Sequence, residues 1–473
     1  MSKNPYREDR DELRELLRQF ENLKNGRPHG FLEEESFERI IDYFDEQEDI
    51  PQALQAVELG IDQYPYSSSL LIKKADLLLA TRRYNEALRL LEKAALYDSS
   101  DINLYILKTE AYLALDQQPR AIELLEEALQ LFEGEERIEL LFELTDVYDD
   151  YEEFDKVFDC LALILEEDPL NEEALYKICF WTDFTGRNEA SIRLHQRIID
   201  EHPYSELAWF NLGAAYQGLK LYEKSIDAYM YCVTIDEKFD YAYRNMGDAY
   251  IRLRKYRDAI EMLEKVLELS RPEEVIHEAM GYCYDKLGQL AQARFHYRKA
   301  SHLNPEDSKL YYKIACTYLN EGQFESAIKQ LNQALKMNRL QPDYNLVMGM
   351  ALVELKQYEK AVEHFSLVIK ARPRSVKGWQ AMLDCMLVSG HLDHGLEYAD
   401  AAYAATGQKP VFLFYRTAVL FATGQTKQAL TALEQAMMQA PRLIKKLAEL
   451  HPKILQHPQV VDLVARYKRS RSL

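Results

Sequence analysis

Apolar residues recur along this chain with a period of 34 residues. Residues 208–236 (AWFNLGAAYQGLKLYEKSIDAYMYCVTID) and 242–270 (AYRNMGDAYIRLRKYRDAIEMLEKVLELS) align at that offset without gaps. Within one period, positions 4, 7, 8 and 11 have the spacing of one helix face, and positions 17, 20, 24 and 27 form a second such face. Each period therefore predicts two amphipathic helices.

Extending this register predicts twelve consecutive repeats between residues 34 and 443, with a two-residue insertion at Glu136 and Arg137. The expected repeats are 34–67, 68–101, 102–135, 138–171, 172–205, 206–239, 240–273, 274–307, 308–341, 342–375, 376–409 and 410–443. Position numbers below count from the first residue of each repeat.

Small residues recur in this register at two positions. Position 20 is Ala, Ser or Gly in eleven repeats, and position 8 is glycine in four of them, at Gly213, Gly247, Gly281 and Gly349. Small side chains let two helix axes approach closely. Position 32 is proline in six repeats, which ends a helix because proline has no amide proton. The weakest copies are the first, the fourth and the last two, which carry Ile41, Val157, Leu383 and Thr417 at these small positions.

The pattern W/L/F–x2–L–G/A–x2–Y, followed by A–x3–F/Y/L and a proline, resembles the tetratricopeptide repeat (TPR). The resemblance covers residues 34–443 and implies an all-α fold, an α-solenoid of antiparallel helix pairs stacked in a right-handed superhelix. Terminal helices must cap such an array. We expect an N-terminal cap in residues 1–33, with a helix at 9–23 that NGRPHG (25–30) ends, and C-terminal capping helices with a basic tail in residues 444–473.

Composition agrees with a folded protein that is not exported. The 473 residues are 47% hydrophobic and carry a net charge of −20. Neither a signal peptide nor an apolar run long enough to span a membrane is visible, so a cytoplasmic location is expected. Six scattered cysteines without a CxxC motif are expected to be reduced, buried thiols.

The resemblance implies that first-helix positions 2, 5, 6, 9, 12 and 13 line a concave groove. This groove begins acidic, because residues 1–171 hold 18 basic and 42 acidic residues. The candidate binding residues in repeats 1 and 4 are Glu38, Asp42, Asp45, Glu46, Glu143, Asp146, Asp149 and Asp150. They suit a basic protein partner, and the alternative is a charged face that only keeps the protein soluble.

The middle of the groove is mixed in charge. The candidate binding residues there are Asn211, Arg244, Asn245, Arg252, Lys309 and Lys313, which suit an acidic or phosphorylated segment. Some TPR domains hold a chaperone's C-terminal carboxylates with basic and asparagine residues. Arg244, Lys309 and Lys313 fit that pattern, but Asp248 and Ala279 stand where asparagine is required, and Asp248 would repel a carboxylate. A complete clamp of this kind is therefore not expected.

The last repeats present an apolar groove, formed by Leu346, Val347, Met350, Val353, Leu387, Val388, Phe414, Tyr415 and Phe421. An exposed patch of this kind binds an amphipathic helix or an extended peptide. We favour the alternative that the C-terminal helices cover it, because residues 443–464 carry an apolar stripe of their own.

No P-loop, GxGxxG, HExxH or GxSxG motif occurs, and no catalytic residue, cofactor or metal site is expected. The preferred function is a non-catalytic scaffold or adaptor that binds protein or peptide partners in the groove, with no small-molecule substrate. One alternative is a regulatory subunit of a separate enzyme. Another is an RNA- or ribosome-associated factor that uses the basic tail Lys468, Arg469 and Arg471. The net negative charge argues against nucleic-acid and membrane partners.

Overall fold

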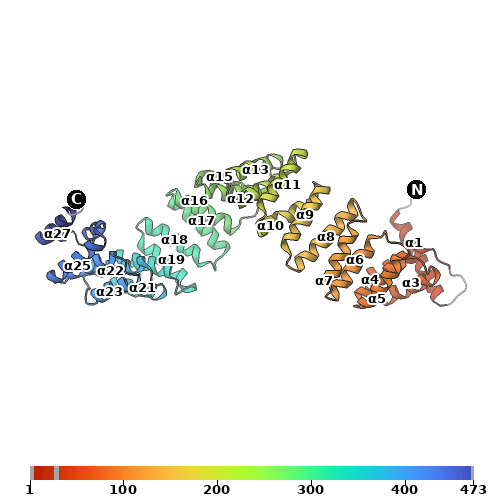
Figure 1. The fold of residues 1–473 in the computed structure, drawn as a ribbon, viewed down its shortest axis with the longest axis horizontal. Helices are drawn as coiled ribbons and strands as arrows, with labels where there is room; N and C mark the ends of the chain where they lie inside the picture. The colour runs from red at the N-terminus through yellow and green to blue at the C-terminus, as the bar shows by residue number, and fades with distance from the viewer. Residues whose placement is uncertain (1–4, 26–30, 470–473) are drawn as a thin grey trace. The chain divides into compact units, whose positions relative to one another are not determined.

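The computed structural model describes residues 5–25 and 31–469, and every regular element among them is helical (Figure 1). The prediction of an all-α protein is confirmed. Contacts divide the chain into two compact units, residues 1–237 and residues 238–473. Within the described residues, the helices are too short or too polar to cross a bilayer. The superhelical winding that the resemblance implies stays a prediction.

The first unit contains thirteen helices in the part that is described. They are α1 (Pro5–Lys24), α2 (Glu34–Glu46), α3 (Ile50–Gln63), α4 (Ser68–Ala80), α5 (Tyr84–Ala95), α6 (Ile102–Ala114), α7 (Gln118–Ala128), α8 (Glu135–Asp150), α9 (Phe154–Glu167), α10 (Glu172–Thr185), α11 (Asn188–Glu201), α12 (Glu206–Gly218) and α13 (Tyr222–Ile235). The even-numbered helices from α2 onward are the first helices of the expected repeats. Among these, α2, α4, α6 and α8 each contact the next and so form a continuous row.

The second unit continues the alternation and then changes at its C-terminal end. Its helices are α14 (Asp240–Arg252), α15 (Tyr256–Leu269), α16 (Glu274–Lys286), α17 (Leu290–Leu303), α18 (Ser308–Asn320), α19 (Phe324–Met337), α20 (Pro342–Glu354), α21 (Tyr358–Ala371), α22 (Val376–Ser389), α23 (Gly395–Ala405), α24 (Val411–Ala422), α25 (Thr426–Gln439), η1 (Pro441–Leu443), α26 (Ile444–Leu450), η2 (Pro452–Gln456) and α27 (Pro458–Arg469). The first helices α18, α20, α22 and α24 contact one another in sequence.

The turn inside each expected repeat has one geometry. At position 15 the backbone is left-handed, with φ between 57° and 77°, at Glu48, Arg82, Asp116, Glu152, Gly186, Lys220, Arg254, Gly288, Gly322, Lys356, Gly390 and Gly424. In ten of these twelve turns, all but those at Gly186 and Gly390, the next amide then bonds to a carbonyl five residues back, as Arg83 N does to Leu78 O at 2.8 Å. This hydrogen bond satisfies a carbonyl at the helix end and reverses the chain toward the second helix.

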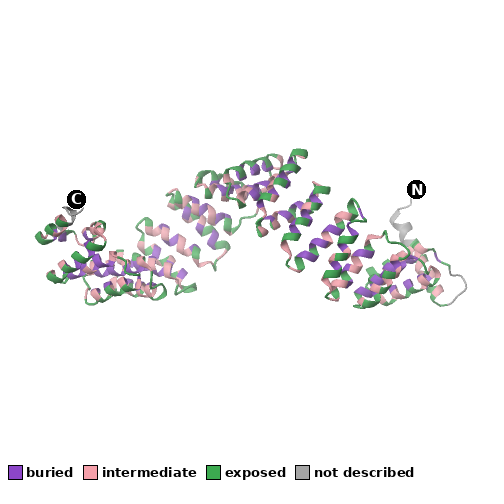
Figure 2. Cartoon of the chain, viewed as in Figure 1, coloured by how far each residue is buried: buried purple, intermediate pink, exposed green. Residues whose placement is uncertain are grey.

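Where position 8 is glycine, the side chain at position 24 packs directly against it, as Tyr229, Leu263, Tyr297 and Phe365 do against Gly213, Gly247, Gly281 and Gly349. A Cβ atom on Gly213 would lie 2.6 Å from two ring carbons of Tyr229, so only glycine fits opposite that ring. The eleventh repeat reverses the arrangement, because Leu383 and Ala399 stand at these positions in one buried cluster. The eleventh copy, which looks weak by its residue at position 8, therefore has a small residue at position 24 instead. Figure 2 shows the buried residues of the described helices alongside exposed ones.

The two-residue insertion lengthens a helix rather than a loop. Glu136 and Arg137 lie in the first turn of α8, and the Arg137 side chain pairs with Glu167. At the N-terminal end, α1 buries Phe20 against Phe37 and Ile40 of α2. The expected break at residues 25–30 lies, beyond Asn25, outside the described residues.

The C-terminal helices pack onto the last repeat. Leu447, Ile454 and Val460 join Phe414 of α24 in one buried cluster, with Phe421 at its margin. These helices therefore cover the part of the apolar groove that lies on α24. Met350 and Val388, on α20 and α22, remain exposed. The side chains of the basic tail lie outside the described residues.

Candidate partner-binding site

Four carboxylates occupy one position in successive repeats of the first unit. Position 9 of repeats 1 to 4 holds Asp42, Asp76, Glu110 and Asp146, which lie on α2, α4, α6 and α8. Because each of these helices contacts the next, the four side chains form a row that we call the acidic track. The sequence analysis found its two ends and missed Asp76 and Glu110. Comparing the residue at position 9 of successive repeats would have identified both.

The charges of the track act on one another. Burial raises the pKa of Asp76, Glu110, Glu143 and Asp146, and neighbouring carboxylates raise it further. The charge of Asp45 raises the pKa of Asp76, and the charge of Asp76 raises that of Glu110. The charges of Asp146 and Glu110 both raise the pKa of Glu143. A raised carboxyl pKa means that desolvation and repulsion between like charges destabilise the ionised form. A cation bound along the track would relieve both.

Two lysines of the chain already contact the track. Lys73 pairs with Asp42, and Lys177 Nζ lies 3.9 Å from Asp146 Oδ1 and 2.8 Å from Glu173 Oε1. The other carboxylates predicted to bind a partner are Glu38 and Glu143, which are half-buried, and Asp45, Glu46, Asp149 and Asp150, which are exposed. Two cations thus neutralise part of the surface, and most of its negative charge faces solvent.

Beyond the track, α10 carries a row of exposed aromatic side chains. Tyr176, Phe180 and Phe184 are 63%, 61% and 57% exposed and stand four residues apart, at positions 5, 9 and 13 of the fifth repeat. We call these three residues the aromatic ridge. The rings of Phe180 and Phe184 stack 5.8 Å apart, and Trp181 supports both. The ridge was not predicted, although first-helix position 9 leads to it directly.

Lys177 reaches the acidic track from α10, the helix that carries the ridge. Its ammonium group reaches from α10 to Asp146 on α8 and lies 5.0 Å from the ring centre of Phe142. The chain therefore places one lysine of its own between a carboxylate and an aromatic ring. This is the chemistry that a basic partner side chain would find on the same surface.

Asn211 lies inside the first unit and not on its surface. Its side chain is 2% exposed, and its amide nitrogen lies 2.8 Å from Leu175 O and 3.2 Å from His195 Nε2. His195 Nδ1 lies 2.8 Å from Ser191 O, which can only accept, so Nδ1 carries the proton and Nε2 accepts from Asn211. Asn211 therefore ties the fifth and sixth repeats together, and we leave it out of the candidate surface.

In the second unit, three of the predicted cations are held by carboxylates of the same unit. Arg244 Nη2 lies 2.7 Å from Glu273 Oε2. Arg252 Nε lies 3.4 Å from Asp248, and Lys313 pairs with Glu278. These pairs reduce the positive charge that this face offers to an acidic segment. The remaining two predicted residues are Asn245, which is half-buried, and Lys309, which is exposed.

Neither Cys160, which is buried, nor Cys179, which is half-buried, is activated. Desolvation raises the pKa of the Cys160 thiol to about 12 and that of Cys179 to about 11, the reverse of what a nucleophilic cysteine needs. Over residues 5–25 and 31–469, His, Cys, Asp and Glu side chains form no group that could hold a metal ion.

Two family models match parts of the chain. Residues 342–375 match the family model described as tetratricopeptide repeat, over the same residues as one of the repeats marked out from the sequence. The prediction that the chain carries tetratricopeptide repeats is confirmed. A second model, the C-terminal ARM domain of tetratricopeptide repeat protein 21, matches residues 215–352 of this chain. No curated protein sequence matches.

Several solved TPR structures are similar to the chain. The C-terminal part of a TPR repeat-containing protein from Cytophaga hutchinsonii is 18% identical with a TM-score of 0.44, over 54% of this chain and 99% of that one. A chain of the crystal structure of the APC/C hetero-tetramer Cut9-Hcn1 is 16% identical with a TM-score of 0.37, over 82% of this chain and 90% of that one. YrrB, described as a TPR protein with an unusual peptide-binding site, is 21% identical with a TM-score of 0.36, over 40% and 96%. What those proteins bind does not transfer to this chain at such similarity.

Proposed function

We propose that the protein is a non-catalytic scaffold or adaptor that binds a basic protein segment on the first-helix face of its first unit. The observation that carries this proposal is position 9 of repeats 1 to 5, which reads Asp42, Asp76, Glu110, Asp146 and Phe180. An unbroken series of carboxylates that ends at exposed aromatic rings matches a segment rich in lysine or arginine with an apolar anchor at one end.

The physical basis is charge complementarity joined to apolar burial. Lysine and arginine side chains would place their charged groups among the carboxylates and lay their methylene stems on the aromatic ridge. Each cation would also lower the raised carboxyl pKa values, so that desolvation and repulsion within the track favour binding. Phe180 and Phe184 would supply the anchor, because aromatic side chains dominate the energetics of most protein interfaces.

The acidic partner expected near repeats 7 to 9 receives less support from the geometry. Arg244, Arg252 and Lys313 each pair with a carboxylate of their own unit, and an acidic segment would have to displace those partners. We therefore place the main recognition surface in the first unit.

Affinity capture with the full chain tests the proposal. We expect stoichiometric partners that the unmodified chain retains and that are lost when Asp146, Asp149 and Asp150 are all changed to Lys. A matched control changes the same net charge at exposed residues outside the first-helix face, as Glu123→Lys, Glu127→Lys and Glu133→Lys. The control should keep the partners. Partners retained equally by both triple variants would refute the proposed surface.

The aromatic ridge can be tested with the same partners. Phe180→Ala and Phe184→Ala should weaken binding by at least about tenfold without unfolding the repeat, because both side chains are mostly exposed. Leu303→Ala, an exposed apolar residue on the second helix α17, is the control and should leave affinity unchanged.

A further inference from the structure

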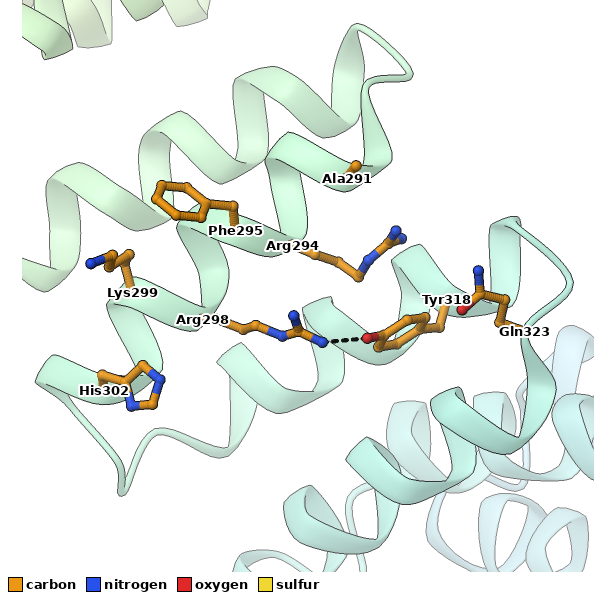
Figure 3. Close-up of a pocket in the computed structure, with 8 residues that line it drawn as sticks. All are labelled: Ala291, Arg294, Phe295, Arg298, Lys299, His302, Tyr318 and Gln323. Carbon is orange, nitrogen blue, oxygen red and sulfur yellow. Dashed lines mark hydrogen bonds between the residues drawn. The ribbon is translucent and has the colours of Figure 1, made fainter.

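A pocket in the second unit gathers positive charge away from the first-helix row (Figure 3). Arg294, Arg298 and His302 stand four residues apart on α17, with Lys299 beside them, and Tyr318 of α18 faces them. Figure 3 shows the side chains of Arg294 and Arg298 extending from α17 toward the Tyr318 ring. These residues line a cavity of about 530 Å³, a size typical of ligand sites.

The Arg294 guanidinium is held in place but has an unused donor. Its Nη2 atom lies 2.9 Å from Glu321 Oε2, and the group sits 4.6 Å from the ring centre of Tyr318. The side chain is only 12% exposed, and its Nη1 atom is buried without a hydrogen-bond acceptor. This donor is closed to solvent, so the Arg294 guanidinium supplies positive charge beside the cavity rather than a hydrogen bond into it.

The neighbouring groups add further donors. Arg298 donates to the Tyr318 hydroxyl oxygen, which leaves the hydroxyl proton free to donate in turn. Lys299 Nζ lies 5.7 Å from the ring centre of Phe295 at the edge of the same cavity. Two arginines and a lysine therefore line the cavity, and the one carboxylate paired with them, Glu321 on Arg294, leaves an excess of two positive charges.

We propose that this pocket binds a phosphoryl group carried by a phosphorylated protein segment. An excess of two positive charges matches a phosphate monoester better than a single carboxylate. Arginine forks and a hydroxyl can bond several phosphate oxygens at once, whereas a carboxylate offers only two. The cavity is much larger than a phosphate group, and exposed Phe295 with Ala291 provides an apolar wall for flanking residues of a peptide.

The test uses the full chain and two peptide libraries with random flanks, one centred on phosphoserine and one on serine. We expect the chain to retain the phosphoserine library at least about tenfold more strongly. Arg298→Gln should remove that preference, and Lys299→Gln should weaken it. Arg257→Gln, which removes an exposed arginine from α15, should leave it unchanged. Arg298 and Lys299 are exposed, so their replacement leaves the fold intact, and circular dichroism checks this.

Three further probes distinguish a phosphopeptide site from a carboxylate site and from a site for a free phosphate compound. A library centred on aspartate should be retained no better than the serine library, and equal retention with phosphoserine would make the pocket a carboxylate site and overturn the proposal. Inorganic phosphate and free phosphoserine should compete only weakly. Binding of either as tightly as the phosphopeptides would assign the pocket to a free phosphate compound. Equal retention of the serine and phosphoserine libraries would also overturn the proposal.

Discussion

Replacing Gly349 with alanine should destabilise the tenth repeat, although alanine is the better helix former. Gly349 lies in α20 at position 8, and a Cβ there would stand 2.7 Å from Phe365 Cζ, 2.8 Å from Cδ1 and closer still to Cε1. Ordinary contact begins near 3.4 Å, so the ring would have to move by more than about 0.6 Å. Phe365 is almost fully buried in one cluster with Met348, Leu352 and Met382.

The size of the effect follows from two opposed terms. Overpacking a filled core costs about 1–3 kcal/mol, and glycine to alanine inside a helix contributes a gain of about 1 kcal/mol. We expect a net loss of up to about 2 kcal/mol in Gly349→Ala. The chain supplies the matched control, because Ala315 already stands opposite Leu331 at these two positions of the ninth repeat. In the Phe365→Leu background, Gly349→Ala should therefore become neutral or stabilising.

Native-state hydrogen exchange of α20 and α21 measures the local free energy of opening, which suits a repeat array better than a global unfolding curve. The quantity of interest is the difference between the effect of Gly349→Ala in the two backgrounds. A change of sign supports the packing rule for positions 8 and 24. The same loss in both backgrounds would refute it, since the cost could not then come from the Phe365 ring.

Three other outcomes can be measured directly. Ala293→Leu should lower the local stability of α17 by about 1–3 kcal/mol, because Ala293 is fully buried at position 20; unchanged exchange there would mean that the register is misplaced. Burial holds the pKa of His195 near 4, so the stability it contributes in the neutral form is present above pH 6.5 and is lost as the pH falls toward 4, by up to about 3 kcal/mol. Hydrogen exchange of α11 at pH 7 and pH 5 should show this fall, and His195→Leu should lack it. Binding of a basic partner should weaken as the pH falls through the raised pKa values of Asp76 and Glu110, hence at a higher pH than for ordinary carboxylates; titration calorimetry at several pH values would contradict this if affinity stayed constant.

The sequence predicts the helices well because their signal is local. Apolar spacing within 34 residues gives two helix faces, and small residues at positions 8 and 20 show where the helices meet. The left-handed turn at position 15 was not predicted, since glycine occupies it in only five repeats and charged residues fill the others. There the hydrogen bonds of the turn fix the backbone whatever the side chain.

The site was only partly predictable because it depends on contacts between repeats. Asp146 and its neighbours form a cluster in one helix, whereas Asp76 and Glu110 are single charges that gain meaning when helices stack. The pairing of Lys313 with Glu278 likewise joins two repeats and cannot be read from either alone. Asn211 misled the prediction because a polar residue at a surface-type position turned inward to serve His195.

Seven of the turns hold a charged residue in the left-handed conformation, and these are positions where substitution could make the protein more stable to heat. They are Glu48, Arg82, Asp116, Glu152, Lys220, Arg254 and Lys356. A residue with a Cβ in this conformation costs about 1 kcal/mol, which glycine would avoid. Part of that gain is offset, because glycine increases the conformational entropy of the unfolded chain. Because each repeat contacts mainly its neighbours, such gains would accumulate along the chain. A more thermostable variant could therefore be made without altering the acidic track, the aromatic ridge or the arginine pocket.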